Sequence, residues 1–599
     1  MSHPRIRPED LERRIDCALG RTPCELRLTN LRLLDVMNGR ILEDAEIFID
    51  QGLIVEAGVG CKATAVKTMD LNGGLAVTAL MDAHVHIESS MVTPVHFARL
   101  VAPFGTTCVV ADPHEIANVL GITGIGFMLD QAKKAEIDIR FMLSSCVPST
   151  PFETAGAELK AADLVELIDH ERVLGLAELM NVPGLLAKDP DLLAKAAMAL
   201  NAGKRIDGHA PLVAGERLSA YAACGVSTDH EASSAVELTD RLQRGIGVLM
   251  REGSAARNVQ ALAQAATPAN WRFLSLCTDD SSPDDVCRRG HMNHVVRRAI
   301  ECGIPAIEAI RMATVNTAQR YGLTGKGVLA PGYDADIAVI RDLTTMTVSQ
   351  CFAKGRLLAQ DGRMVTPEPE VMLPEAVKGC VRIQSLKPDN LTVATASGKA
   401  RVIGIVEGNL NTRHLIESVR TRADGTVYCA DNPGLVKLAV IERHRRTGRM
   451  GLGLLRGFVR TGEKLNGAIA STVAHDSHNI VVAGDSDADM LEAVRAIERM
   501  QGGLVLVREG KVVASLALDG AGLMASTDAA ATGRAKTHFI ETAHTHFAVP
   551  AGVHPVMTLS FLPLAVIPHL RVTDLGLFDV DAFRVTGIDP ESPSSTTGV

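Results

Sequence analysis

The sequence predicts an α/β protein built on a (β/α)8 TIM-like barrel, with a small accessory β domain and a C-terminal α/β domain. Three observations predict this fold. Eight apolar strand-like segments alternate with helix-like segments over residues 81–325, a usual length for such a barrel. Short strand-and-turn segments at residues 25–80 and 326–375 flank this stretch and are expected to form one accessory sheet. After a Pro-Glu-Pro-Glu linker at residues 367–370, a second α/β region covers residues 376–588.

The composition is that of a folded globular protein, and it excludes several classes. Of the 599 residues, 46% are hydrophobic and 22% are charged, which is enough apolar side chain to offset the entropy of ordering a core. A net charge of −9 and only 3% aromatic residues argue against nucleic-acid binding. The apolar stretch from Val556 to Leu570 contains two prolines and is too short to cross a membrane. Twelve cysteines without a CxxC pair and an N-terminus without a secretory signal predict a cytoplasmic protein.

The N-terminal part of the chain is expected to begin with a helix and continue as strands. Residues 1–24 are interpreted as a helical extension, with a short polar helix from Pro8 to Ala18. Two apolar runs around an Asp-Gln-Gly turn over Ile47–Val55 indicate a hairpin. At the other end, residues 589–599 are rich in Pro, Ser and Thr and are expected to be a disordered tail.

The barrel prediction depends on strand-like segments, each followed by a polar turn and a helix-like stretch. Helices rich in Ala and Leu are expected at Asp191–Leu200 and Val295–Cys302. The alternative that this rhythm leaves open is a doubly wound open sheet. The eight expected strands are Met81–His86, Thr106–Asp112, Arg140–Val147, Val173–Leu179, Arg205–His209, Gly225–His230, Gly245–Arg251 and Arg272–Asp279.

The C-terminal region is expected to contain strands at Leu504–Val507 and Val512–Leu516 and a helix at Ala488–Met500. Two of its motifs are given no functional role. The glycines of Gly451–Gly457 lack the GxGxxG spacing of a phosphate-binding loop. The basic run Arg443–Arg446 is interpreted as the solvated face of a helix end rather than an anion site.

Metal-type ligands stand at the ends of five of the eight predicted strands. His84 and His86 are two residues apart on the first strand, so both imidazoles point to one face and can reach one ion. A second HxH motif, His544-Thr545-His546, is interpreted as having no such role. Because the carboxyl ends of barrel strands meet at one rim, further ligands are expected there. They are Glu178 on the fourth strand, His209 on the fifth, His230 on the sixth and Asp279 on the eighth.

Four imidazoles and two carboxylates are more ligands than one ion needs, which predicts two divalent ions. Glu178 is expected to bridge them, because a carboxylate can give one oxygen to each ion. Imidazole and carboxylate ligands suit Zn, Mn, Fe or Ni and do not choose among them. Asp279 is expected to accept a proton from a hydroxide-forming water and pass it to a leaving group. The expected ligand sets are His84, His86 and Asp279 for one ion, and His209 and His230 for the other.

These residues resemble the amidohydrolase superfamily of metal-dependent hydrolases and, within it, the adenine deaminase family. The likeness covers nearly the whole chain apart from the first 24 residues. The segment Gly332–Ile337 is similar to the strand with which the superfamily's accessory sheet resumes after the barrel. Glu178 stands where many relatives carry a carboxylated lysine, which disfavours urease-like and dihydroorotase-like functions. The segments most similar to the adenine deaminase family are Asp82–Ser90, Ala111–Val119 and Ala474–Asn479.

The resemblance implies a purine-salvage enzyme that hydrolyses adenine to hypoxanthine and ammonia, by attack of a metal-bridged hydroxide on C6. It implies Mn²⁺ as the metal, with Fe²⁺ or Zn²⁺ as alternatives. Asp279 is expected to be catalytic, and Glu88 is expected to protonate ring N1 if the first strand continues that far. His114 and Glu115 are further candidates for this step, with support of a ligand as their alternative role. Substrate contact or ligand support is also expected of Asp112, Asp280, Ser281, His475 and His478.

The segment His475–His478 follows the apolar run Ile469–Ala474, which places it at a strand end. On the family resemblance we interpret it as part of a lid over the barrel mouth, and the alternative is a cap for the next helix. The expected partners are a small purine substrate and a second copy of the chain in a dimer, without nucleic acid or membrane.

Two other functions are compatible with the same residues. The first is a different hydrolase of the same superfamily, which acts on another aminopurine or a cyclic amide. The second is a non-catalytic scaffold, which the complete ligand set disfavours. The unrelated zinc deaminase fold is excluded, because the HxE of His86–Glu88 has no PCxxC partner in the chain.

Overall fold

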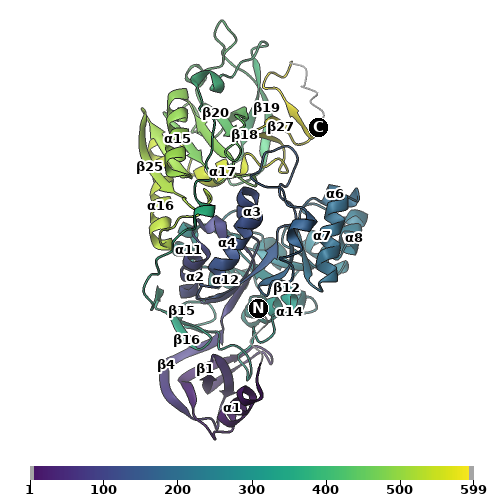
Figure 1. Ribbon diagram of the computed structural model, residues 1–599, viewed down its shortest axis with the longest axis vertical. Helices are drawn as coiled ribbons and strands as arrows, with labels where there is room; N and C mark the ends of the chain where they lie inside the picture. Colours follow the sequence, from purple (N-terminus) through teal and green to yellow (C-terminus); the bar gives the residue numbers. More distant parts are fainter. Residues whose placement is uncertain (1–5, 592–599) are drawn as a thin grey trace.

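The computed structural model describes residues 6–591, in three parts that lie one above another along the long axis (Figure 1). A small sheet with helix α1 lies at one end, the barrel lies in the middle, and the C-terminal region lies at the other end. Helix α1 (Pro8–Ala18) has the predicted bounds. In the part of the chain that the structure describes, no helix is both long enough and apolar enough to cross a membrane.

The predicted tail differs from the structure where it can be compared. Residues 592–599 lie outside the described residues. Asp589, however, is buried, and its carboxylate accepts hydrogen bonds from the backbone N–H groups of Ala396 (2.8 Å) and Ser397 (3.1 Å). The prediction of a disordered tail is therefore wrong at its first residues, because Asp589 has backbone partners nearly 200 residues away that the sequence did not reveal.

The middle part is a parallel sheet that closes on itself. The strand order is β12-β11-β10-β9-β8-β7-β6-β5-β13, and β13 directly follows β12 in the chain. Since Asp279 of β13 pairs with Val85 of β5, the eighth strand meets the first and the sheet is a barrel rather than an open sheet. All eight predicted strands are confirmed, at β5 (Leu80–His86), β6 (Thr106–Ala111), β7 (Asp138–Leu143), β8 (Val173–Leu179), β9 (Arg205–Gly208), β10 (Thr228–Asp229), β11 (Gly247–Arg251), and β12 (Leu274–Cys277) with β13 (Asp279–Asp280).

The barrel strands are buried along most of their length, as expected for a parallel sheet with helices on its outside. Every residue of β5 and β6 is buried, which explains why their sequences are apolar runs and not alternating patterns. The helices after the strands are α2 (Pro94–Val101), α3 (His114–Leu120), α4 (Ile122–Ala132), α5 (Ala161–Leu164), α6 (Val182–Leu186), α7 (Pro190–Asn201), α8 (Gly215–Ala223), α9 (Ala235–Gln243), α10 (Val259–Ala263), α11 (Pro283–Arg289), α12 (Met292–Glu301), α13 (Ala306–Met312) and α14 (Val315–Tyr321).

The two segments that flank the barrel form one sheet, as predicted. Its order is β17-β16-β15-β14-β4-β1-β2-β3, and the antiparallel pairing of β14 with β4 joins the segment after the barrel to the one before it. The predicted hairpin is β2–β3, where Gln51 and Gly52 have φ angles of 50° and 79°, as a tight hairpin turn requires. The strands are β1 (Cys24–Asp35), β2 (Arg40–Asp50), β3 (Leu53–Gly58), β4 (Ala65–Thr78), β14 (Ile337–Ile340), β15 (Val348–Ala353), β16 (Arg356–Gln360) and β17 (Arg363–Met364).

The C-terminal region contains an eight-stranded sheet of order β19-β18-β21-β20-β23-β22-β24-β25 and a three-stranded sheet β26-β27-β28. The strands and the helix predicted there are confirmed as β24, β25 and α15. The elements are β18 (Lys399–Ile405), β19 (Thr412–Ser418), β20 (Leu435–Ile441), β21 (Met450–Arg456), β22 (Ala468–Ser471), β23 (Ile480–Gly484), α15 (Asp487–Met500), β24 (Gly503–Arg508), β25 (Lys511–Ala517), α16 (Ala529–His546), α17 (Pro555–Phe561), β26 (Leu570–Thr573), β27 (Gly576–Asp579) and β28 (Arg584–Thr586).

The basic run Arg443–Arg446 is solvated at Arg445 and Arg446, as interpreted, but it does not end a helix, and the interpretation is wrong for Arg443. It follows strand β20, and Arg443 is fully buried. Its guanidinium donates hydrogen bonds to the carbonyl oxygens of Cys380 (3.1 Å), Ala521 (3.0 Å) and His478. These acceptors belong to three segments that are distant in the sequence. The polar character of Arg443 alone does not reveal that it is buried among them. The glycine-rich motif Gly451–Gly457 lies mostly in strand β21.

Candidate metal centre

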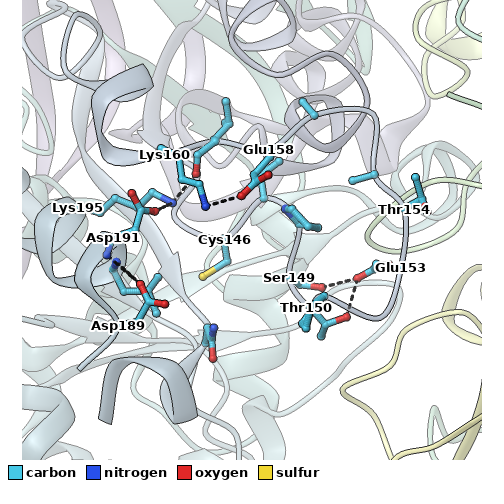
Figure 2. A pocket seen from close by; sticks show the side chains of 18 of the residues that line it. Cys146, Ser149, Thr150, Glu153, Thr154, Glu158, Lys160, Asp189, Asp191 and Lys195 are labelled. Atoms are coloured by element: carbon cyan, nitrogen blue, oxygen red, sulfur yellow. Dashed lines mark hydrogen bonds and ion pairs between the residues drawn. The ribbon is translucent and has the colours of Figure 1, made fainter. Parts of the chain in front are cut away.

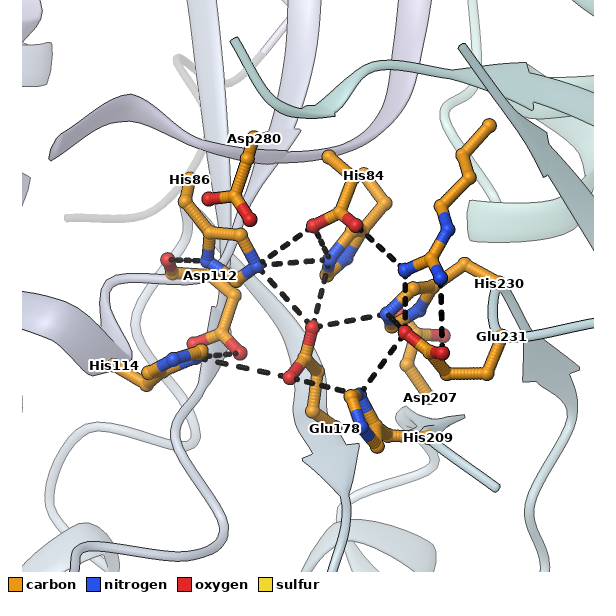
Figure 3. Close-up of polar contacts among 12 residues, drawn as sticks. His84, His86, Asp112, His114, Glu178, Asp207, His209, His230, Glu231 and Asp280 are labelled. Atoms are coloured by element: carbon orange, nitrogen blue, oxygen red, sulfur yellow. Dashed lines mark hydrogen bonds and ion pairs between the residues drawn. The ribbon is translucent and has the colours of Figure 1, made fainter. Parts of the chain in front are cut away.

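The predicted ligands meet around Glu178 at the carboxyl ends of the barrel strands (Figure 3). Glu178 Oε1 lies 2.9 Å from His84 Nε2, 3.3 Å from His86 Nε2 and 3.2 Å from His230 Nε2. Its other oxygen, Oε2, lies 3.4 Å from His209 Nδ1. The two oxygens of one carboxylate therefore face different imidazoles, as the prediction of a bridging residue requires.

Asp279 completes the cluster from strand β13. Its Oδ1 atom lies 3.2 Å from His86 Nε2 and 3.7 Å from His84 Nε2. The donor atoms fall into sets within 4.8 Å of one another, and two of the sets agree with the predicted ones when Glu178 is added to each. A further set was not predicted as ligands. Three of the sets, each of which contains Glu178, are His84, His86, Glu178 and Asp279; Glu178, His209 and His230; and His86, Asp112, His114 and Glu178.

The arrangement of the donor atoms fits a bound cation. His86 Nδ1 lies 3.2 Å from the carbonyl oxygen of Asp112 and donates to it, so the lone pair of the neutral ring is on Nε2. That atom lies only 3.2 Å from His84 Nε2, in the company of two carboxylates. At His209, the buried Nδ1 atom has no hydrogen-bond partner among the described residues. Buried nitrogens without partners are costly, and a divalent transition metal accepts this set of ligands.

The charges of the cluster point to the same conclusion. Burial raises the pKa of Glu178, but the neighbouring His230 and His209 outweigh this and hold it well below the usual value. Burial likewise works against a charge on His84, but hydrogen bonds to Asp279 and Glu178 raise its pKa to about 10. The two ionised carboxylates thus attract positive charge into a buried site, and this charge comes either from protons on the imidazoles or from metal ions.

Asp82 positions the first ligand strand, a role that was not predicted. Its Oδ1 atom accepts hydrogen bonds from the backbone N–H groups of His84 (3.2 Å) and Thr278 (3.1 Å). This carboxylate therefore ties the first strand to the eighth, beside the ligands that each carries. Asp82 lies within the segment Asp82–Ser90, which resembles the adenine deaminase family, so the sequence contained a signal that could have identified it.

Arg251 and Glu231 are two further residues that the sequence interpretation missed. The guanidinium of Arg251 donates to Asp279 Oδ2 (2.8 Å) and to Glu231 Oε2 (2.9 Å). Burial raises the pKa of Asp279, but hydrogen bonds to His84 and His86 and the charge of Arg251 hold it well below the usual value. Arg251 is the last residue of strand β11. A charged residue at the end of the seventh predicted strand was therefore a signal in the sequence that could have identified it as a site residue.

Glu88 is buried in the site, but not on the strand. Strand β5 ends at His86, as predicted, and the chain then turns into a short 3-10 helix, η1 (Ile87–Ser90), so the condition that the strand continues to Glu88 is not met. Glu88 is 3% exposed, and its Oε1 atom accepts a hydrogen bond from the backbone N–H of Ile116 (3.1 Å). Its Oε2 atom has no partner among the described residues. Burial raises the pKa of Glu88 to about 7.

His114, at the start of α3, lies at the edge of the cluster between two carboxylates. Its Nδ1 atom is 3.1 Å from Asp112 Oδ2 and 3.8 Å from Glu178 Oε2. Its Nε2 atom is 3.3 Å from Glu115 Oε1. These residues, predicted from one short segment, are therefore brought to the cluster together.

The remaining predicted residues surround the cluster on the side of the C-terminal region. Asp280 accepts a hydrogen bond from Ser89 (2.5 Å), and Ser281 is buried next to it. His475 Nδ1 lies 2.8 Å from Glu115 Oε1, and His478 Nε2 bonds to the other oxygen of Glu115. A small cavity of about 30 Å³ separates Asp280 and Ser89 of the barrel from His475, Met557 and other residues of the C-terminal region.

The other HxH motif and a cavity under the loop after β7 lie apart from the cluster. His544 and His546 are in the last turn of α16, where His544 Nδ1 lies 3.2 Å from the carbonyl oxygen of Val549. A cavity of about 400 Å³ lies under the loop that follows β7, between Glu153 and the buried Lys195 (Figure 2). Lys195 donates to the carbonyl oxygens of Ser145 (2.8 Å) and Leu159 (2.6 Å) and so holds this loop in place.

A closed parallel barrel with imidazoles and carboxylates at the carboxyl ends of its strands is the arrangement expected of an amidohydrolase. The model of the amidohydrolase family matches residues 75–358, and the model of the adenine deaminase C-terminal domain matches residues 409–584. By these matches and by its relatives, the chain belongs to the adenine deaminase family.

The relatives match this chain over almost its whole length. An adenine deaminase from Nitratidesulfovibrio vulgaris is 46% identical over 96% of this chain and 98% of its own. Adenine deaminases from Clostridium acetobutylicum and Geobacillus kaustophilus are each 41% identical, over 96% and 97% of this chain and 99% of their own. A solved adenosine deaminase from Xanthomonas campestris with bound zinc has a TM-score of 0.44 and 15% identity, over 58% of this chain and 95% of its own.

Proposed function

We propose that this protein catalyses the hydrolysis of adenine and water to hypoxanthine and ammonia. The observation that carries the proposal is the position of Glu178, between four imidazoles and close to the Asp279–His86 pair, in a chain that matches adenine deaminases from end to end. The reaction replaces an amino group on an electron-poor ring carbon, and it requires an activated water and protons delivered to the ring and to the departing amine.

We propose that the cluster holds two divalent ions, with Mn²⁺ as the first choice and Fe²⁺ or Zn²⁺ as alternatives. When bound, such ions would lower the pKa of water, so that hydroxide would be available as the nucleophile near neutral pH. Glu178 lies between the two sets, as a shared ligand must. The proposed ligands are His84, His86 and Asp279 for one ion, His209 and His230 for the other, and Glu178 for both.

Asp279 is proposed to transfer protons. One of its oxygens faces the imidazoles, while Arg251 fixes the other at 2.8 Å. A carboxylate held in this way keeps a fixed orientation and remains ionised, so it is ready to take a proton from water. It then delivers this proton to the amino group as the C6–N bond breaks and ammonia leaves.

Glu88 is proposed to contact ring N1 of adenine. Its Oε1 atom is held by Ile116, whereas its buried Oε2 atom has no partner among the described residues. A buried polar atom without a partner usually has a functional explanation, and a ring nitrogen that must gain a proton is a suitable one. His114 is proposed as a second catalytic group beside it, aligned by Asp112 and Glu115.

An ultraviolet assay tests the proposed function. Purified protein with Mn²⁺ is mixed with adenine, and in a parallel sample with adenosine, while absorbance and ammonia release are followed. We expect the adenine spectrum to change to that of hypoxanthine, with one ammonia released for each base converted. An unchanged adenine spectrum in protein that contains metal contradicts the proposal, and turnover of another aminopurine alone favours a different amidohydrolase.

We also propose a cytoplasmic location and a homodimer. All twelve cysteines are free thiols, which supports a reducing compartment. The dimer is an expectation from the family resemblance, and sedimentation analysis of the purified protein tests it. The domain boundaries at residues 24, 80, 325, 375 and 588 likewise stay predictions, for which limited proteolysis is the test.

A further inference from the structure

A short segment of the C-terminal region, His475–Asn479, lies against helix α3 at the rim of the barrel. His475 Nδ1 is 2.8 Å from Glu115 Oε1, and His478 Nε2 bonds to Glu115 Oε2. Two imidazoles thus hold both oxygens of one barrel carboxylate, although 363 residues separate Glu115 from His478 along the chain.

Contacts on its other sides fix this segment in place. Asn479 donates from its side-chain amide to the carbonyl oxygen of Thr154 (3.0 Å), in the loop whose position Figure 2 shows. The ring of His475 stacks on that of Phe561, with centroids 4.4 Å apart and planes 19° from parallel. The segment therefore has a defined position against both the barrel loop and helix α17.

The hydrogen bonds of His478 determine which of its nitrogens carries a proton. The backbone N–H of Ala474 donates to His478 Nδ1 at 3.1 Å, so a neutral ring has its hydrogen on Nε2. That hydrogen points to Glu115. The donor atoms of Glu115, His475 and His478 are close enough to suggest a further metal site, but this tautomer leaves His478 Nε2 without a lone pair for a metal.

The contact matters because Glu115 leads directly to the cluster. Glu115 is only 2% exposed, so its carboxylate depends on protein donors instead of water. Its Oε1 atom lies 3.3 Å from His114 Nε2, and the other ring nitrogen of His114 lies 3.8 Å from Glu178. A continuous series of contacts therefore runs from His478 to the centre of the site.

We propose that His478, assisted by His475, is a positioning residue for the reaction. By holding Glu115 it orients His114 against the metal cluster, so that the C-terminal region completes the active site as well as covering it. This inference rests on the proposed deaminase function.

Two substitutions at one position separate this role from a local structural one. The amide of Gln reaches the place of Nε2, so His478→Gln keeps the donor to Glu115 and loses the acceptor for Ala474. The shorter Asn reaches the place of Nδ1, so His478→Asn keeps the backbone contact and loses the donor. The backbone at His478 has φ = 53°, a region that Asn adopts more readily than Gln. Folding alone therefore favours the Asn variant, whereas the proposal favours the Gln variant.

The measurements are kcat and KM for adenine, metal content and thermal melting, on the full-length protein with Mn²⁺. We expect His478→Asn to lower kcat by about 10- to 100-fold, the usual effect of leaving a buried carboxylate oxygen unpaired. KM should change by less than about twofold and metal content should stay at the wild-type value, while His478→Gln retains kcat within about threefold. An Asn variant as active as the Gln variant, or more active, overturns the inference.

Two further measurements distinguish the hydrogen-bonding role of His478 from a metal site at Glu115 and from failure of the proposed function. In a Glu115→Gln background, His478→Asn should have no additional effect on kcat, because the shared contact is already lost. Loss of a metal equivalent in Glu115→Gln would identify a metal site instead and overturn the hydrogen-bonding role. A wild-type protein that contains metal but does not convert adenine contradicts the proposed function itself. Wild-type turnover with an unaffected Asn variant contradicts only the inference.

Discussion

Individual carboxylates in this site differ in role because their neighbours differ. Glu178 divides its two oxygens between separate imidazoles, whereas Asp279 has imidazoles on one oxygen and Arg251 on the other. Glu88 has a backbone partner on one oxygen and none on the other. Residue type and strand position predicted that these carboxylates belong to the site. Their different surroundings, which set their roles, depend on Arg251 and on the turn at η1, and neither of these was predicted.

The substitution Asp279→Asn is expected to lower kcat by a factor of about 10²–10⁴, because an amide cannot take a proton from water. The measurement is ammonia release from adenine under saturating substrate, with metal content determined on the same sample. A variant that turns over at the wild-type rate contradicts the role assigned to Asp279.

The substitution Glu178→Gln is expected to lower the number of bound metal equivalents, since the central ligand loses its charge while keeping its size. Elemental analysis after dialysis against Mn²⁺ and gel filtration measures this. Glu153→Gln is the matched control, because Glu153 is a buried carboxylate outside the metal cluster and should leave the metal content unchanged. Equal metal content in all three proteins argues against Glu178 as the shared ligand.

At the scale of elements, the barrel strands were predictable because burial on both faces makes them continuous apolar runs. Their ends place the ligands, as at Asp279 on β13, which pairs with Val85 of β5. The 3-10 turn after His86 was not predictable, because the local sequence is compatible both with this turn and with a longer strand. Residues at helix ends also bring polar groups into the core. His291, immediately before α12, is such a buried residue.

His291 is expected to make the stability of the barrel depend on pH. Burial lowers its pKa to about 3, so the folded protein keeps the ring neutral, whereas an unfolded His titrates near 6.5. Stability from this group is therefore complete above about pH 6.5 and falls as the pH decreases towards 3. From pH 7 to pH 5 the loss is about 2 kcal/mol. Denaturant unfolding of the wild type and of His291→Gln at both pH values measures it, and an equal pH dependence in the two proteins refutes the expectation.

At the scale of the whole molecule, the proposed active site is assembled from two parts of the chain. The barrel supplies all the proposed ligands, and the C-terminal region brings His475 and His478 to the barrel residue Glu115. The small sheet unites segments from both sides of the barrel, through β4 and β14, and so holds its two ends together. Metal binding at the rim is expected to stabilise this assembly, since the ions would join ligands from five different strand positions.

Removal of divalent ions should therefore lower the melting temperature. A ligand present at 100 times its dissociation constant stabilises the folded state by about 2.7 kcal/mol, which corresponds to a shift of a few degrees, on the order of 2–4 °C or less in a chain of this size. Calorimetry before and after chelation, and after Mn²⁺ is restored, tests the expectation. The Glu178→Gln variant should shift less, and a chelated wild-type protein with unchanged melting would show that the cluster does not bind metal tightly.

The sequence by itself determined the barrel, the flanking sheet and the six proposed ligands, because strand periodicity and residue type at strand ends are local properties. Only the tertiary structure decided that Arg251 holds Asp279, that Arg443 is buried among carbonyl groups, and that His478 reaches Glu115. These contacts join residues between 28 and 363 positions apart. Whether such residues meet depends on how sheets and helices pack, and no local pattern in the chain records that.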